Sequence, residues 1–119
     1  EQVEFIVACD ADQIAGVGGL ELFGDAALLR SLLVLPDWRG RRLGEQLVRA
    51  LEQQAINQGM RQIGLLTETA APFFTRLGYE TVSSSALAAP LQQSKEFQSV
   101  CPVTASAMHK VLYTPKSTS

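Results

Sequence analysis

The chain has 119 residues, of which 46% are hydrophobic and 18% are charged. This composition is typical of a folded domain rather than of a disordered segment, and we expect a single domain over residues 1–119. Ten basic and twelve acidic residues give a formal charge of −2, which does not favour nucleic acid or an anionic membrane as partner. No apolar run approaches the ~20 residues needed to cross a bilayer, and no signal-like segment opens the chain.

The few cysteine and histidine residues argue against a disulfide scaffold or a structural metal site. Cys9 and Cys101 lie far apart and lack metal-ligand spacing, and His109 is the single histidine. We therefore expect no metal site and a reducing compartment, with the cytoplasm as the default location. Cys101 is a candidate thiol nucleophile, but no histidine stands near it in sequence, and a small buried core residue is the favoured interpretation.

The first third of the chain predicts an antiparallel meander. Residues 3–8 and 13–22 are strand-like and are joined by a short polar turn, which indicates a hairpin. Three glycines interrupt the second of these segments, Gly16, Gly18 and Gly19. They indicate a bulge or the close approach of another backbone. Residues 26–35 form an almost wholly apolar strand, interrupted at Arg30 and Ser31, of the kind found in the middle of a sheet.

The rest of the chain alternates helices and strands. An apolar residue recurs every four positions from Leu43 to Ala55, which predicts an amphipathic helix of about four turns that ends before Gly59. Four segments follow: a buried parallel strand over 61–67, a short helix over 70–77, a helix over 90–97 and a last strand over 107–113. This order predicts an α/β fold with helices packed on a mixed central sheet, an antiparallel meander plus a parallel strand.

A basic segment stands where the apolar central strand gives way to the long helix. It is Arg39-Gly40-Arg41-Arg42-Leu43-Gly44. Free backbone N–H groups at a helix N-terminus and the positive end of the helix dipole bind anions, and arginines add charge-assisted hydrogen bonds. Diphosphate is the natural guest of such a site. The alternative is an ordinary helix start whose arginines are merely solvated.

Two segments together resemble the acetyl-CoA signatures of the Gcn5-related N-acetyltransferases (GNAT). Residues 32–44 resemble the motif Q/R-x-x-G-x-G/A preceded by a strand that ends in a hydrophobic-x-Val-x-Pro pattern. Residues 70–79 are similar to the second signature, an Ala followed by Phe-Tyr-x-x-x-Gly-Phe. The resemblance covers residues 26–82. A further likeness is to the arsenic-resistance-associated branch of these enzymes, carried by residues 65–74, by Glu96-Phe97 and by residues 101–105.

The resemblance implies an N-acetyltransferase that moves an acetyl group from acetyl-CoA to the primary amine of a small, amino-acid-like substrate. The alternative is an acyl-CoA-binding domain with little turnover, acting as a sensor or partner module. The expected partner is thus a small-molecule amine, and the sequence leaves open whether the chain is a monomer or a homodimer.

The implied cofactor site combines the central strand with the basic segment. The resemblance implies that residues 32–34 pair with the pantetheine arm as a pseudo-strand, within a splay between this strand and residues 63–66. It also implies that the N–H of Val34 polarises the thioester carbonyl. The implied cofactor-binding residues are Leu32, Leu33, Val34, Arg39, Gly40, Arg41, Arg42, Leu43, Gly44 and Phe74.

The sequence departs from the family pattern in three ways. Arg42 occupies the place of the first glycine of the motif, and we expect ordinary right-handed backbone angles there. Phe74 stands where many relatives carry the tyrosine that protonates the departing thiolate, and phenylalanine has no proton to donate. The additional strand and two helices that precede the first hairpin in the family have no counterpart, so we expect these N-terminal elements to be missing.

The general base and the acceptor site remain open between alternatives. Glu21 is a candidate base that acts through a water, or a solvated hairpin carboxylate, and Glu68 is equally ambiguous. Arg30 interrupts an apolar strand and needs an anionic partner, either a substrate carboxylate or a structural one such as Glu21 or Asp25. Ser31 lines the same cleft or faces the other side. The candidates are therefore Glu21 and Ser31 for catalysis, and Arg30 and Thr67 for substrate binding.

Overall fold

The computed structural model describes residues 2–40, 42–67, 69–83 and 106–112. The elements in chain order are β1 (Gln2–Asp10), β2 (Gln13–Phe23), β3 (Ala26–Val34), the 3₁₀ turn η1 (Pro36–Trp38), α1 (Leu43–Asn57), β4 (Gln62–Thr67), α2 (Ala71–Arg76), β5 (Glu80–Val82) and β6 (Ser106–Val111). The strands form one six-stranded sheet in the order β1-β2-β3-β4-β6-β5. β3 and β4 are parallel, whereas the other neighbouring strands are antiparallel. The mixed sheet with packed helices confirms the predicted fold class.

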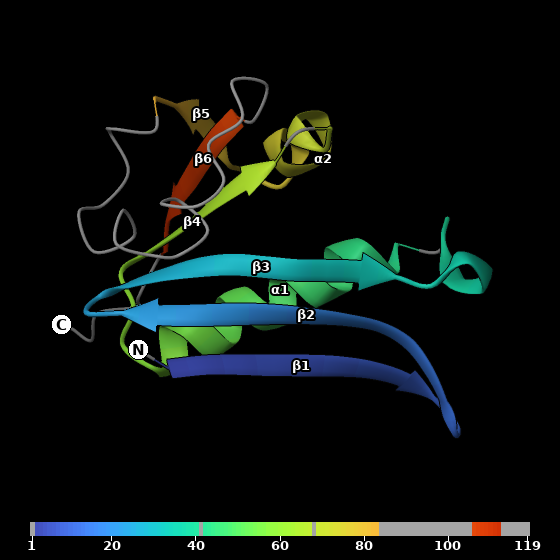
Figure 1. Cartoon of the computed structure of the whole chain (residues 1–119). Helices are drawn as coiled ribbons and strands as arrows, with labels where there is room; N and C mark the ends of the chain where they lie inside the picture. The colour runs from blue at the N-terminus through green and yellow to red at the C-terminus, as the bar shows by residue number, and fades with distance from the viewer. Residues whose placement is uncertain (1, 41, 68, 84–105, 113–119) are drawn as a thin grey trace, which may run out of the picture.

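Helix α1 packs on one face of the sheet, behind β2 and β3 in Figure 1. Its buried hydrophobic side chains are those of the predicted apolar stripe, Leu47, Val48, Leu51 and Ala55. They join Leu20 and Leu29 of the sheet in the main core. Full burial of one such leucine contributes about 1.5–3 kcal/mol, so this stripe fixes the helix on the sheet. The helix ends as predicted, because Gly59 follows it in the left-handed conformation, with φ of 84°.

The glycines of β2 let the helix and a neighbouring strand approach closely. A Cβ atom on Gly18 would stand 2.7 Å from Leu51 Cδ1, and one on Gly16 would stand 2.8 Å from the backbone oxygen of Leu33. The β2–β3 register also shifts between Val17 and Gly19. The predicted close approach is therefore confirmed, and the irregularity beside these glycines is a bulge whose extra residue belongs to β3.

Strands β3 and β4 separate soon after they start. They pair only from Ala26 to Leu28 and from Gln62 to Gly64, and β4 then stays with β6 as far as Thr67. Figure 1 shows β4 turning away from β3, so that the sheet opens into two arms with α2 at the end of the second arm. The splay that the resemblance implied is present.

The remaining elements agree with the predictions apart from their ends. The predicted helix over 70–77 is α2, with Pro72 in its first turn, and the predicted last strand is β6. The turn η1 between β3 and α1 was not predicted, although Pro36 at its start favours such a turn. The predicted helix over 90–97 and Cys101 lie outside the described residues. Among the helices that the structure describes, none is long and apolar enough to cross a membrane.

Candidate functional site

A cavity of about 300 Å³ occupies the splay between β3 and β4. Its lining consists of Leu29, Arg30, Ser31, Leu32, Leu65, Leu66, Thr67, Thr69, Ala70, Phe73 and Phe74. Four of these side chains are polar and the others form apolar walls. The structure thus brings together five residues that the sequence suggested for the site: Arg30, Ser31, Leu32, Thr67 and Phe74.

A β-bulge at Ser31 shapes this wall of the cavity. Ser31 has φ of 61°. Between the pairs Gly19–Arg30 and Val17–Leu33, β3 contains one more residue than β2. The extra residue in one strand bends that strand and re-aims its backbone groups. Ser31 thereby lies in the cavity wall, which agrees with the first of its two predicted placements.

Beyond the bulge, the backbone of Val34 points away from β2. The N–H of Leu35 donates to the oxygen of Ala15 over 2.9 Å, and Val34 lies opposite Gly16. Because hydrogen-bonded and non-hydrogen-bonded pairs alternate in an antiparallel ladder, the N–H and C=O of Val34 face the side of β3 from which β4 has departed. The carbonyl accepts a hydrogen bond from Arg39 Nε over 3.0 Å.

A second cavity of about 400 Å³ lies at the start of α1. It is lined by Val34, Trp38, Arg39, Gly40, Arg42, Leu43, Gly44, Glu45, Phe73 and Arg76. Phe73 lines both cavities, so the two meet at its side chain, and we refer to them together as the groove. The first intrahelical hydrogen bond runs from the N–H of Gln46 to the oxygen of Arg42, and the N–H groups before it have no partner inside the helix.

Gly44 keeps the groove open where its two parts meet. A Cβ atom on Gly44 would stand 3.4 Å from Phe73 Cζ and 3.8 Å from Val34 Cγ2. A larger side chain would therefore enter the space between the helix start, α2 and the end of β3. The absence of a side chain at Gly44 therefore leaves this space open beside the backbone of the first helical turn.

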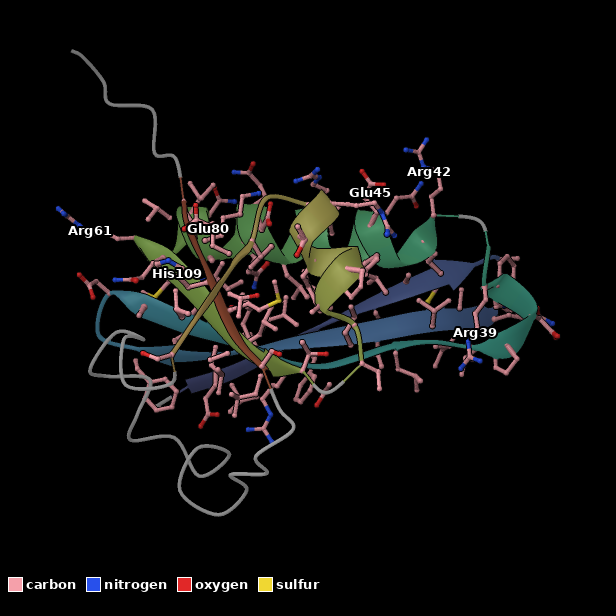
Figure 2. The ribbon with its side chains drawn as sticks, turned by 90° about the horizontal axis from the view of Figure 1, so that it is seen from above. Arg39, Arg42, Glu45, Arg61, Glu80 and His109 are labelled. Atoms are coloured by element: carbon pink, nitrogen blue, oxygen red, sulfur yellow. The ribbon has the colours of Figure 1, made fainter. Side chains whose placement is uncertain are left out.

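The arginines at this end of the molecule do not converge on one point. Figure 2 shows Arg39 and Arg42 leaving the chain in opposite directions. The guanidinium of Arg42 is 82% exposed and lies 3.5 Å from Glu45 of the first helical turn. Arg76 of α2, which the sequence analysis did not single out, also lines the cavity and stands 6.0 Å from the centre of the Phe73 ring. Because Arg76 follows Phe73 by three positions on a predicted helix, the sequence could have indicated that the two side chains are neighbours. Arg41 lies outside the described residues.

The predicted right-handed backbone at Arg42 is wrong. Arg42 is the N-cap residue of α1 and has φ of 63° and ψ of 17°, which is the left-handed region. A non-glycine residue in this region costs roughly 1–2 kcal/mol. The turn from η1 into α1 holds these angles whichever residue stands there, and a glycine would adopt them freely.

Arg30 finds its anionic partner in Glu21. Its Nη1 atom lies 2.9 Å from Glu21 Oε1, and the two side chains are 38% and 12% exposed. The sequence left open whether the partner of Arg30 is a substrate carboxylate or a carboxylate of the protein. In the structure the partner is a carboxylate of the protein, and it is Glu21 rather than Asp25. Glu21 is accordingly not a freely solvated carboxylate, and Glu68 lies outside the described residues.

Phe74 forms part of an aromatic cluster beside the cavity. It is 4% exposed, and its ring meets those of Phe73 and Tyr79 edge to face, with centroids 5.0 and 5.4 Å apart. The hydroxyl of Tyr79 donates to Glu52 Oε2 over 2.9 Å. Burial, and then the Glu52 carboxylate, raise the pKa of Tyr79 above its ordinary value. Tyr79 is thus a poor replacement for the acid that Phe74 lacks.

Comparison with known families identifies the fold. The model of the acetyltransferase (GNAT) domain matches residues 1–81, which is more than half of the chain. The chain belongs to the GNAT acetyltransferase family. The family resemblance derived from the two sequence signatures is thereby confirmed, and GNAT domains use acetyl-CoA.

Solved structures share this GNAT fold. N-acetylglutamate synthase from Neisseria gonorrhoeae, complexed with coenzyme A and N-acetyl-glutamate, is 21% identical with a TM-score of 0.82 over 92% of this chain and 26% of its own. Rv2747 from Mycobacterium tuberculosis, in complex with CoA and NLQ, is 26% identical with a TM-score of 0.78 over 92% of this chain and 76% of its own. An aminoglycoside 6′-N-acetyltransferase complexed with coenzyme A is 19% identical with a TM-score of 0.74, over 97% and 76%.

The chain spans about a quarter of the length of the Neisseria synthase. No curated protein matches its sequence. Among the described residues, no three His, Cys, Asp or Glu side chains gather into a group that could hold a metal ion.

Proposed function

We propose that this domain is an acetyl-CoA-dependent N-acetyltransferase that acts on the primary amine of a small molecule. The observation that carries the proposal is the groove from the start of α1 to the splay, because it joins both GNAT signatures. The first signature contributes Val34, Arg39 and Gly44, and the second contributes Phe73 at the junction of the two cavities.

The groove offers a binding partner for each part of acetyl-CoA. The N–H groups at the start of α1 that have no partner inside the helix, together with Arg39 and Arg76, suit the diphosphate. The backbone of residues 32–34 lacks a β4 partner and suits pairing with the pantetheine arm. The N–H of Val34 is the group that we expect to polarise the thioester carbonyl, within the cavity that Phe74 bounds.

Direct transfer needs little from the protein beyond positioning. The amine nitrogen, after losing a proton to Glu21, attacks the carbonyl carbon of the thioester. The carbon–sulfur bond breaks, the nitrogen loses its second proton, and the thiolate takes one proton from solvent, since Phe74 has none to give. The products are the N-acetylated amine, CoA and one released proton.

The relatives support a small acceptor. Two of the similar structures are named for a reaction on a small molecule. They are N-acetylglutamate synthase and aminoglycoside 6′-N-acetyltransferase. We also propose that the domain belongs to the arsenic-resistance-associated branch of the family, because residues 65–74 resemble that branch.

A second candidate function is binding of acyl-CoA with little turnover. Phe74 in place of the family tyrosine, and the engagement of the Tyr79 hydroxyl with Glu52, favour it. Release of free CoA thiol from acetyl-CoA, measured across a panel of amines, separates the two functions. Amine-dependent release supports the transferase. Calorimetric binding of CoA without release supports the binding module.

A further inference from the structure

The ion pair between Arg30 and Glu21 lies on the sheet face opposite α1, and Arg30 is the member of the pair that lines the cavity of the splay. Glu21 lies opposite Leu28 and Arg30 opposite Gly19, so their side chains share one face. Leu20 and Leu29, the alternating neighbours, belong to the core that α1 covers. Arg30 also lines the cavity in which the acetyl group is expected, one residue before the bulge at Ser31.

The fold has little structural need for this pair. β2 and β3 are already paired by backbone hydrogen bonds on both sides of it, from Phe23 and Ala26 onward to Gly19 and Arg30. A cross-strand ion pair of this kind adds about 0.2–1 kcal/mol. It is also half-buried, which costs solvation for both charges. A contribution this small does not account for an arginine in a strand that is mostly apolar.

The pair can satisfy both charges of a zwitterion. Arg30 has five N–H donors, and the contact with Glu21 involves one of its nitrogen atoms. Glu21 likewise contacts Arg30 through Oε1, which leaves Oε2 for a second donor. Opposite charges 2.9 Å apart match the carboxylate and ammonium groups that one carbon atom carries in an α-amino acid. As a unit the pair is neutral, so it favours neither a plain amine nor a plain acid.

We infer that the acceptor is an α-amino acid whose carboxylate binds Arg30 and whose ammonium group binds Glu21. This inference rests on the proposed function and gives the acceptor its chemical class. Glu21 then holds the nitrogen that is acetylated and takes its first proton, while Arg30 discriminates amino acids from other amines.

The test compares amino acids with the amines formed by their decarboxylation, such as phenylalanine with 2-phenylethylamine. The wild type should show a kcat/KM about tenfold or more higher for the amino acid. Arg30→Gln should abolish this preference by lowering only the amino-acid value. Glu21→Gln keeps an oxygen for Arg30, so the preference should persist while kcat falls for both substrates. The matched control is Arg61→Gln, since Figure 2 shows Arg61 at the opposite end of the molecule from Arg39 and Arg42; it should change neither value.

Thermal unfolding and acetyl-CoA affinity report the integrity of each variant. The inference is overturned by a wild type without preference, or by an Arg30→Gln variant that keeps it or loses both substrates equally. Turnover of amines without preference contradicts this inference alone. Absence of turnover with every amine, while CoA still binds, contradicts the proposed function and this inference with it.

Discussion

The hydroxyl of Tyr79 donates a hydrogen bond to Glu52 Oε2, and Lys110 Nζ reaches the same oxygen over 3.1 Å. These contacts tie the turn after α2, helix α1 and strand β6 together beside the aromatic cluster. Lys110 also donates to the oxygen of Leu77 over 3.0 Å. Tyr79 therefore supports the wall of the cavity that contains Phe74 without offering its own proton to the site.

Replacing Tyr79 by phenylalanine tests this structural role. The pKa of Tyr79 is raised in the folded state, so its contribution to stability is complete below its unfolded pKa of about 10 and is lost as the pH rises further. Tyr79→Phe should lower the free energy of unfolding by about 1 kcal/mol at neutral pH. Above pH ~10 the free energy of unfolding should decrease less steeply in Tyr79→Phe than in the wild type. Chemical denaturation across this pH range measures both effects. An alkaline limb of kcat that disappears in Tyr79→Phe would instead identify Tyr79 as the acid.

Phe74 determines the alkaline side of the pH–rate profile. A CoA thiol has a pKa near the ~8.5 of a reference thiol, so it leaves without a strong acid and turnover should persist. In the wild type, kcat/KM should rise to a plateau as the amine and its base lose their protons. Phe74→Tyr places a phenol at the cavity wall, and it should raise kcat and introduce an alkaline limb. A bell-shaped wild-type profile would show that another group already serves as acid.

The local parts of the fold could be predicted, whereas the contacts between distant segments could not. The apolar repeat from Leu43 to Ala55 specifies the start and buried face of α1 because it depends on helix geometry alone. The partner of Arg30 stayed undecided, since only the β2–β3 register brings Glu21 beside it. The pairing of Tyr79 with Glu52 spans 27 positions and leaves no pattern in the sequence.

The site could be predicted where the family motif specifies it and not where tertiary structure overrides residue preference. The family resemblance implied the splay, which the structure contains, and it indicated Gly44, where a larger side chain would enter the groove. The backbone of Arg42 was predicted wrongly because a preference for right-handed angles is weak beside the constraint of the turn into α1.

Relief of the backbone at Arg42 should stabilise the domain. Arg42→Gly removes the cost of an arginine in the left-handed conformation, which is roughly 1–2 kcal/mol. Glycine also increases the conformational entropy of the unfolded chain, and this destabilises the folded state by about half of that amount. We expect a net gain of up to about 1 kcal/mol in thermal or chemical unfolding. Arg42→Ala is the matched control, because it removes the same charge and keeps the strain. Equal stability of the two variants would contradict the assignment of strain.

Arg39 should contribute to cofactor affinity through charge. Its Nε donates a hydrogen bond to the carbonyl oxygen of Val34, and its side chain lines the cavity at the start of α1. Arg39→Ala together with Arg41→Ala should weaken acetyl-CoA binding about tenfold, which is about 1.4 kcal/mol. The affinity of the wild type should fall as salt is added, and that of the double variant should fall less. Identical salt dependence of the two proteins would count against a diphosphate site here.

Calorimetric titration of acetyl-CoA into the wild type and Gly44→Val tests whether the groove at the start of α1 binds the cofactor. The valine side chain enters the space between Phe73 and Val34, where the groove must admit the cofactor. The matched control is Ala50→Val, an equally branched residue on the exposed side of α1. We expect the wild type and Ala50→Val to bind acetyl-CoA, whereas Gly44→Val should unfold at the same temperature as the wild type and fail to bind. Equal affinity of all three proteins, or no binding by the wild type, would contradict this expectation.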